Sequence, residues 1–430
     1  MNVLSLHKMG HPDDWRESVR SLEFMFKECR PELNCILHDA NLPFPDKYKK
    51  IEFHLIVLGP TFLCSRYNSS TFKKILNNFD FIRNSKAYKV ALPQDDYDCA
   101  GILDKWMVDW SVNVLYSVCP NNWDILYPKF INLGKIKLGY TGYVSKEWIN
   151  KWSEIKPNTL RHVDISYRAS KLPANFGSVG NLKSEIADTF LKSLPKDHKF
   201  KLDISTDKAK TISGSKWHEF LENSKFCLTT PSGSSIYDPY GKIRNMVKEY
   251  STKFPQAKFE EIENACFQNL DSLYTFTAIS PRNLEAALAE TVQIATPGSY
   301  SDLMKPLKHY IPLNSDCSNI KDVLLMISNQ SLIDDIKVNW KRNILQNKRL
   351  LRENIVSEIL ELAEEYYNEN KILIELNSYH VKLIEKYEDN MRFISYAFYT
   401  QMLIRKSLEE MYLIRKLKDI KALVHSLKMF

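Results

Sequence analysis

Short apolar runs alternate with longer amphipathic stretches through the first three quarters of the chain. Apolar runs of roughly four to eight residues indicate buried strands, whereas an apolar period near 3.6 residues indicates helices. Strands that alternate with helices are typical of βαβ units on a parallel sheet, so the predicted fold class is α/β. The pattern predicts strands at 2–6, 53–58, 89–92, 112–117, 163–167, 199–205, 226–230 and 292–296, and helices at 15–29, 181–194, 216–223 and 281–290.

A polar, proline-containing segment at 145–158 divides this pattern into two halves. We therefore expect a Rossmann-like domain at 1–150 and a second one at 151–345, followed by a helical extension at 346–430. Such folds bind ligands at the carboxyl ends of their strands. The expected site is a cleft across which the two domains face each other.

The C-terminal helices carry opposite charges in different segments. Residues 353–370 hold six glutamates and no Lys or Arg, whereas residues 401–430 hold seven Lys or Arg against three Asp or Glu. Apolar residues in the last helix follow helical spacing, so this helix is amphipathic. Two interpretations stay open: packing on the body or on a second copy, and peripheral contact with an anionic membrane surface.

Charge and cysteine content narrow the class of protein. The net charge of +7 suits anionic ligands, but no basic tract is dense enough to predict nucleic-acid binding. The eight cysteines are scattered without a C-x-x-C pair, which argues against a structural zinc site. No signal peptide is evident and no apolar stretch approaches the roughly 20 residues that span a bilayer. We expect a cytoplasmic protein.

The stretch 277–314 carries the most specific chemistry. Ser280 is a good N-cap and Pro281 fits the first helical turn, so a helix is predicted to begin here directly after a strand. Unpaired N–H groups and the helix dipole make such a start an anion site. Arg282 suits a phosphate and Glu285 suits ribose hydroxyls. Together they predict binding of a nucleotide diphosphate.

These residues carry a family resemblance. The runs SPRNLEAALAETVQI, HYIPLNSDCSNIKDVL and RHVDISYRASKLPANFGSVG resemble the donor domain of group 1 glycosyltransferases with the GT-B fold, which are found in bacterial surface-polysaccharide assembly. The likeness covers residues 160–345 well and residues 1–150 only in architecture. It implies two Rossmann-like domains and transfer of a sugar from a nucleotide diphosphate-sugar.

The resemblance also implies roles for single residues. Glu285 matches the ribose-binding glutamate of the family, and Arg168 and Lys171 match the cations that neutralise the diphosphate leaving group. Many members carry another glutamate eight residues earlier, where this chain has Thr277. The donor sugar and the stereochemical outcome therefore stay open.

Two loops complete the predicted site. The segment that contains Ser232 and Gly233 follows a strand and is small and polar, as suits a donor-binding loop. In the first domain, Asp95 and Asp96 end a strand that faces the expected cleft. Either carboxylate could accept the proton of an attacking sugar hydroxyl. His11, in the loop after the first strand, is a further candidate for acceptor contact.

Asp96 and Asp98 also form a D-x-D pattern, which binds a divalent metal in glycosyltransferases of the other fold, GT-A. The two-halved layout argues against that fold, so neither a metal nor another cofactor is expected. The predicted function is transfer of a sugar to a glycan or lipid-linked acceptor, at the inner face of the membrane if the C-terminal helix binds lipid. The alternatives are a nucleotide-sugar epimerase on the same fold and a non-catalytic scaffold with a degenerate donor site.

Overall fold

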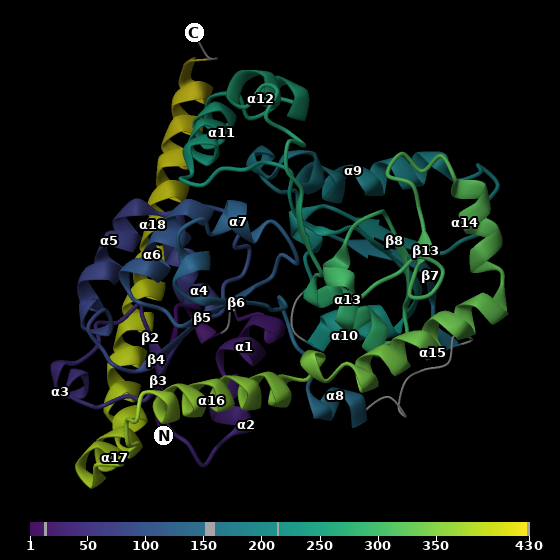
Figure 1. The fold of residues 1–430 in the computed structure, drawn as a ribbon. Helices are drawn as coiled ribbons and strands as arrows, with labels where there is room; N and C mark the ends of the chain where they lie inside the picture. The colour runs from purple at the N-terminus through teal and green to yellow at the C-terminus, as the bar shows by residue number, and fades with distance from the viewer. Residues whose placement is uncertain (13–14, 151–159, 213–214, 428–430) are drawn as a thin grey trace.

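Two parallel β-sheets organise residues 1–312 in the computed structural model of this chain (Figure 1). The structure describes residues 1–12, 15–150, 160–212 and 215–427, with side chains given for these residues except 215 and 410–427. Each sheet forms a domain with helices on its faces, and further helices follow the second sheet. The predicted fold class, two Rossmann-like domains with a C-terminal helical extension, is confirmed.

The first sheet has six parallel strands in the order β2-β1-β3-β4-β5-β6. Its buried strands are apolar on both faces because helices cover both sides. The strand order reverses between β1 and β3, which places a topological switch point there. The strands are β1 (Asn2–His7), β2 (Asn34–Asp39), β3 (Leu55–Leu58), β4 (Tyr88–Ala91), β5 (Val114–Ser117) and β6 (Lys135–Leu138). The helices of this part are α1 (Glu17–Glu23), α2 (Met25–Cys29), α3 (Asp46–Lys49), α4 (Pro60–Leu63), α5 (Ser69–Asn78), α6 (Ala100–Asp109), α7 (Trp123–Leu126) and α8 (Lys146–Asn150).

The second sheet has five parallel strands in the order β13-β12-β9-β7-β8, with its switch point between β7 and β9. Its strands are β7 (Val163–Arg168), β8 (Leu202–Ser205), β9 (Ser224–Thr229), β12 (Val292–Ala295) and β13 (Ile311–Pro312), and a separate antiparallel pair joins β10 (Ser232–Ser234) to β11 (Phe276–Ala278). Its helices are α9 (Gly177–Ser193), α10 (Ser215–Glu222), α11 (Lys242–Lys253), α12 (Phe259–Cys266), α13 (Pro281–Leu288), α14 (Ile320–Ile327) and α15 (Gln330–Gln346).

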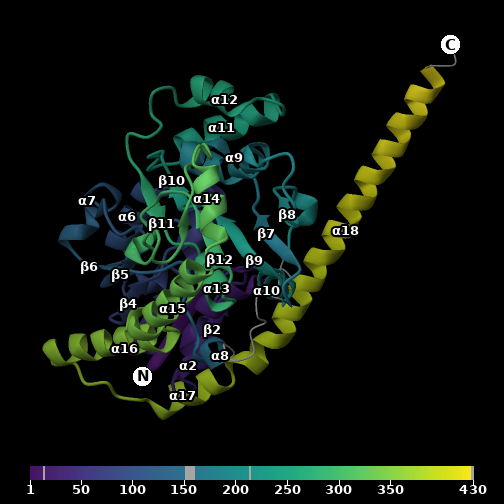
Figure 2. The same ribbon diagram turned by 90° about the vertical axis from the view of Figure 1, so that its right-hand side faces the viewer.

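The remaining helices return to the first domain. Helix α16 (Arg352–Glu369) buries Ile355, Ile359 and Ala363 in one core with Val57 and Tyr88 of the first sheet. Helix α17 (Ser378–Glu385) and the start of α18 (Tyr387–Leu427) pack on another core of the same domain. Beyond these contacts α18 runs past the body as one long helix (Figure 2). The polypeptide therefore crosses between the two domains twice.

The predicted strands and helices are present, with shifted ends. The predicted helix 15–29 is two helices, α1 and α2, which meet at Phe24. Strands β2 and β6 were not predicted, since NCILHD holds an apolar run of only three residues and KIKL alternates polar and apolar residues. The predicted domain limits stay predictions, and most of the predicted linker, 151–159, lies outside the described residues. Within the described part of the chain, no helix is both long and apolar enough to cross a bilayer.

A buried carboxyl group fastens α1 to the first sheet. Glu23 Oε1 accepts hydrogen bonds from the Thr61 N–H at 2.8 Å and the Thr61 hydroxyl at 2.5 Å. Its Oε2 has no hydrogen-bond partner among the described residues and faces Gly59, where a Cβ would lie 1.9 Å from it. Burial raises the pKa of Glu23 from 4.5 to about 8, although the bonds from Thr61 oppose the shift. Glu23 is therefore protonated in the folded protein at neutral pH.

This group makes stability depend on pH. Between pH 4.5 and about 8 the unfolded chain has lost the Glu23 proton and the folded chain still holds it. The free energy of unfolding therefore falls as pH rises through this window, by up to about 1.4 kcal/mol per pH unit from this group. We expect Glu23→Gln to flatten this dependence in urea unfolding at several pH values, whereas Glu17→Gln, an exposed change on the same helix, leaves it intact. Equal slopes in Glu23→Gln and wild type would contradict the assignment.

Candidate functional site

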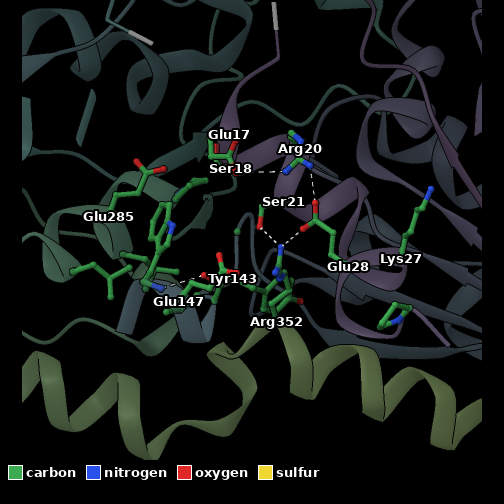
Figure 3. A pocket seen from close by; sticks show the side chains of 18 residues that line it. Glu17, Ser18, Arg20, Ser21, Lys27, Glu28, Tyr143, Glu147, Glu285 and Arg352 are labelled. Atoms are coloured by element: carbon green, nitrogen blue, oxygen red, sulfur yellow. Dashed lines mark hydrogen bonds and ion pairs between the residues drawn. The ribbon is translucent and has the colours of Figure 1, made fainter. Parts of the chain in front are cut away.

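A pocket of about 470 Å³ lies between the two domains (Figure 3). Helix α1 contributes Glu17, Ser18 and Ser21 from the first domain, and α13 contributes Leu284 and Glu285 from the second. The segment 142–148 that leaves the first domain and Arg352 at the start of α16 close the remaining sides. The pocket therefore sits in the predicted cleft, at the end where the chain crosses between domains.

Glu285 lies in the wall of this pocket. Its side chain is only 8% exposed, and its Oε2 accepts a hydrogen bond from Trp217 Nε1 of α10 at 2.7 Å. Burial raises the pKa of Glu285, while the Trp217 N–H and the nearby His218 and Arg282 oppose the shift. The indole fixes one carboxylate oxygen, which leaves Oε1 available to a ligand hydroxyl. The predicted helix start is also correct, since α13 begins at Pro281 with Ser280 as N-cap.

Arg282 follows in the first turn of α13. Its Nη1 donates to the backbone carbonyl of Arg168 at 2.7 Å, and its guanidinium carbon lies 5.2 Å from the centre of the Trp217 ring. This ring therefore orients Arg282 and Glu285 together. None of the ion pairs among the described residues includes Arg282, so its charge is available to an anion.

The structure gives Arg168 another arrangement than the predicted one. Its Nη2 is 2.5 Å from Asp203 Oδ1, and its Nη1 donates to the carbonyls of Tyr167 and Asp203. A guanidinium that is already paired with a carboxylate is a weaker phosphate ligand. Lys171 is exposed in the loop after β7. Neither residue lines the pocket, and neither does Arg282.

Lys183, which was not predicted as a site residue, lies near Arg282 and Asp95. Lys183 of α9 is half-buried, and its Nζ donates to Ser232 Oγ at 3.2 Å. Burial lowers the pKa of Lys183, Asp95 across the cleft opposes the shift, and Arg282 adds to it. The described ion pairs do not include Lys183 either. Two neighbouring cations without carboxylate partners, one of them half-buried, form a site suited to an anion.

Sequence reasoning missed Lys183 because a lysine in an amphipathic helix usually lies on the solvated face. A signal was present nevertheless. Lys183 lies three residues after Gly180 and three before Ile186, both of which are buried. It therefore sits on the apolar stripe of α9, where a lysine needs a specific reason.

The loop after β9 supports this anion site. Ser232 is half-buried, and its Oγ accepts a hydrogen bond from the Lys183 ammonium. Gly233 has a different reason to be glycine: a Cβ there would lie 2.0 Å from the carbonyl oxygen of Phe276 in the paired strand β11. Ser280 caps α13, and its N–H donates to Asn283 Oδ1 at 2.8 Å. These two residues shape the site without pointing at a ligand.

Asp95 and Asp96 occupy different environments. Asp96 is fully buried and accepts hydrogen bonds from the hydroxyls of Ser117 and Tyr127, both at 2.6 Å. Burial raises its pKa, and no acceptor sugar can reach it there. Asp95 is half-buried, has a left-handed backbone (φ 49°), and accepts a bond from the Tyr97 hydroxyl at 2.7 Å. The structure thus leaves Asp95 as the candidate base and corrects the proposal for Asp96.

A buried arginine holds the Asp95 loop in place. Arg66 donates to the backbone carbonyls of Asp95 at 2.8 Å, Asp98 at 2.9 Å and Leu63 at 2.9 Å. A left-handed backbone conformation costs energy for a residue other than glycine. The hydrogen bonds from Arg66 offset this cost and hold the turn at Asp95.

The D-x-D pattern does not form one site. Asp98 pairs with Arg244 of α11 in the second domain, whereas Asp96 points to hydroxyls within the first domain. The Asp98–Arg244 pair instead joins the two domains at the side of the cleft.

Two remaining positions have clear contacts. The His11 ring meets the Tyr399 ring of α18 edge-on at 5.5 Å, so the loop after β1 lies against the C-terminal helix. Thr277, at the place of the family's other glutamate, lies in β11 and shares a hydrogen bond with Ser299 Oγ at 2.8 Å. Thr277 is buried.

Comparisons with known proteins bear on the fold. No family model matches the chain, and no curated protein matches it in sequence. In structure, the chain is similar to Anabaena Alr3699/HepE in complex with UDP and glucose (11% identity, 85% of this chain and 99% of that one, TM-score 0.47). It is also similar to a DNA-modifying β-glucosyltransferase solved with and without uridine diphosphoglucose (12%, 84% and 99%, TM-score 0.43) and to a glycosyltransferase from Rickettsia africae (10%, 85% and 98%, TM-score 0.43).

These identities and TM-scores describe a shared architecture only. The fold therefore rests on the two parallel sheets of this chain and on the strand order within each of them. Two Rossmann-like domains of this kind are the architecture that the sequence predicts.

Proposed function

We propose that this protein transfers a sugar from a nucleotide diphosphate-sugar to a hydroxyl of a glycan or lipid-linked acceptor, in the synthesis of a cell-surface polysaccharide. The nucleoside lies in the pocket beside Glu285, which accepts ribose hydroxyls. The diphosphate lies against Arg282 and Lys183, and the sugar extends toward Asp95.

The observation that carries the proposal is the pair Lys183 and Arg282. The ion pairs among the described residues include neither cation, Arg282 is close enough to Lys183 to lower its pKa, and Arg282 lies three residues before Glu285 on α13. A diphosphate supplies the missing negative charge. It also becomes more negative as the glycosidic bond breaks, so fixed cations lower the barrier.

The chemical step uses the remaining residues. The acceptor oxygen attacks the anomeric carbon, the bond from that carbon to the diphosphate oxygen breaks, and the nucleoside diphosphate leaves with the bonding electrons. In an inverting reaction the Asp95 carboxylate takes the acceptor proton. The cations replace the role of a metal at the leaving group, so we propose a reaction that needs no metal or other cofactor.

A cytoplasmic location is proposed from the donor substrate and from the free cysteines. Nucleotide-sugar donors and eight unpaired cysteines suit a reducing cytoplasm. A lipid-linked acceptor would place the protein at the inner face of the membrane. The exposed part of α18 supports one of two contacts for the C-terminal helices, a membrane surface or a second copy.

The test is product analysis with a panel of nucleotide diphosphate-sugars, with and without acceptor glycans and EDTA. We expect one donor to be consumed, with release of its nucleoside diphosphate, faster when an acceptor hydroxyl is present and equally fast in EDTA. An altered nucleotide-sugar without release would instead show an epimerase. Donor binding without turnover would show a scaffold, and a requirement for metal would contradict the role of the cations.

A further inference from the structure

The second domain carries an inserted unit between β9 and α13. Strands β10 and β11 pair as its stem, and helices α11 and α12 form its end, at the top of Figure 1. The unit has a small apolar core of its own, which contains Ile243 and Val247 of α11 and Ile262 of α12. A packed core fixes the positions of the side chains around it. The unit therefore presents a defined surface to the first domain.

This unit contacts the first domain at α6 and α7. The Ile102 N–H donates to the Pro239 carbonyl at 3.2 Å, and the Tyr237 hydroxyl donates to the Ile125 carbonyl at 2.9 Å. Gly101 lies so close to the unit that a Cβ there would be 3.0 Å from Pro239 Cβ. Hydrogen bonds and close packing thus determine where the unit lies on the first domain.

Arg244 of α11 makes the charged part of this contact. Its guanidinium donates to both carboxylate oxygens of Asp98, from Nε to Oδ1 at 3.3 Å and from Nη2 to Oδ2. The guanidinium carbon also lies 4.5 Å from the centre of the Tyr67 ring. The Asp98 side chain is 5% exposed, and no other ion pair among the described residues includes it. A buried carboxylate depends on such a partner, so Arg244 restrains the position of Asp98.

Asp98 belongs to the same turn as the candidate base. Its N–H donates to the Asp95 carbonyl at 3.0 Å, and Arg66 donates to the backbone carbonyls of both residues. The Tyr67 hydroxyl donates to the Asp95 carbonyl at 3.3 Å. Arg244 therefore contacts this turn twice, at the Asp98 carboxylate and through the Tyr67 ring. Since Asp95 has a left-handed backbone, its conformation depends on contacts of this kind.

We propose that Arg244 is a positioning residue for the transfer reaction: by binding Asp98 across the domain boundary, it sets the 95–98 turn so that the Asp95 carboxylate lies within reach of the acceptor hydroxyl. The inference rests on the proposed function, in which Asp95 is the base. Arg244 acts through Asp95 and is assigned no contact with donor or acceptor. Because Arg244 belongs to the domain with the proposed donor site, it ties the position of the base to that domain.

The first test measures transfer by Arg244→Gln and Arg244→Lys with saturating donor and acceptor. Glutamine removes the charge that holds Asp98, and kcat should fall about 10- to 100-fold, because a misplacement of about 1 Å can cost a hundredfold. Lysine keeps the charge but not the planar fork, so kcat should fall only about three- to tenfold. Calorimetric affinity for the nucleoside diphosphate should stay within about twofold of wild type in both variants. Lys248→Gln, an exposed change on the same helix, is the matched control and should keep wild-type kcat.

The second test separates positioning from a purely structural role. In the Asp95→Asn background, Arg244→Gln should change kcat by less than about twofold, because residues that act through one group are not additive. A residue that only joins the domains would lower kcat equally in both backgrounds. Thermal unfolding reports whether each variant folds, and Arg244→Lys supplies the same comparison if Arg244→Gln does not fold.

The outcomes distinguish this inference from the function on which it rests. Normal kcat in Arg244→Gln, or an equal loss with and without Asp95→Asn, would overturn the role of Arg244 and leave the proposed function standing. Weaker binding of the nucleoside diphosphate in Arg244→Gln would also overturn it. A wild type that consumes no nucleotide-sugar would overturn the proposed function, and the role of Arg244 with it.

Discussion

Replacing Lys183 with methionine is expected to lower the turnover of donor and acceptor by about a hundred- to a thousandfold. Methionine keeps most of the length and the apolar stem but removes the ammonium from the buried face of α9. Arg282 alone is then left to stabilise the negative charge that builds on the leaving diphosphate. The effect should appear mainly in kcat, measured with saturating acceptor and the consumed nucleotide-sugar.

Lys192→Met is the matched control for this change. Lys192 lies on the same helix and is exposed, so its replacement should leave kcat within about twofold of wild type, as for most surface changes. Thermal unfolding of both variants separates loss of function from loss of fold. Normal kcat in Lys183→Met would exclude this lysine from the leaving-group site.

Replacing Glu285 with glutamine is expected to weaken binding of the nucleoside diphosphate about 10- to 100-fold. The amide keeps the shape of the side chain but loses the charge that strengthens hydrogen bonds from ribose hydroxyls. Trp217 Nε1 already occupies one carboxylate oxygen, so few alternatives remain for the ribose. Calorimetric titration of the variant measures the loss directly.

The same carboxylate predicts a pH dependence of binding. Because burial raises the pKa of Glu285, wild-type affinity should fall on acidification at a higher pH than an ordinary glutamate would show. Glu285→Gln should lack this step. Glu219→Gln, an exposed change on α10, should bind like wild type, and an equal affinity in Glu285→Gln would remove this residue from the nucleoside site.

The fold was predictable where strands are buried on both faces. FHLIVL and the runs that precede Pro93 and Cys119 contain apolar residues at consecutive positions, which leaves few other interpretations. The strands at the edges of the first sheet lack such long runs of consecutive apolar residues. Strand β2 has only three consecutive apolar residues at the edge of its sheet, and β6 exposes Lys135. Their place depends on tertiary pairing that a local pattern does not encode.

The site was predictable only where a local motif fixes a side chain. Ser280 and Pro281 determine where α13 begins, and this start places Glu285 in the wall of the pocket. Arg168 follows a strand as expected, but Asp203 of the neighbouring strand binds its guanidinium. Asp96 lies next to Asp95 in sequence, yet Ser117 and Tyr127 bind it inside the domain. Both outcomes depend on residues distant in sequence.

The most direct test of the central claim is calorimetric titration of the full chain with nucleoside diphosphates in EDTA. The claim is that Lys183 and Glu285 bind one nucleotide in the cleft. It predicts that one nucleoside diphosphate binds with a single site, that Lys183→Met and Glu285→Gln each weaken it at least about tenfold, and that Lys192→Met and Glu219→Gln do not. Absence of binding by any nucleoside diphosphate, or equal affinity in all four variants, would contradict it.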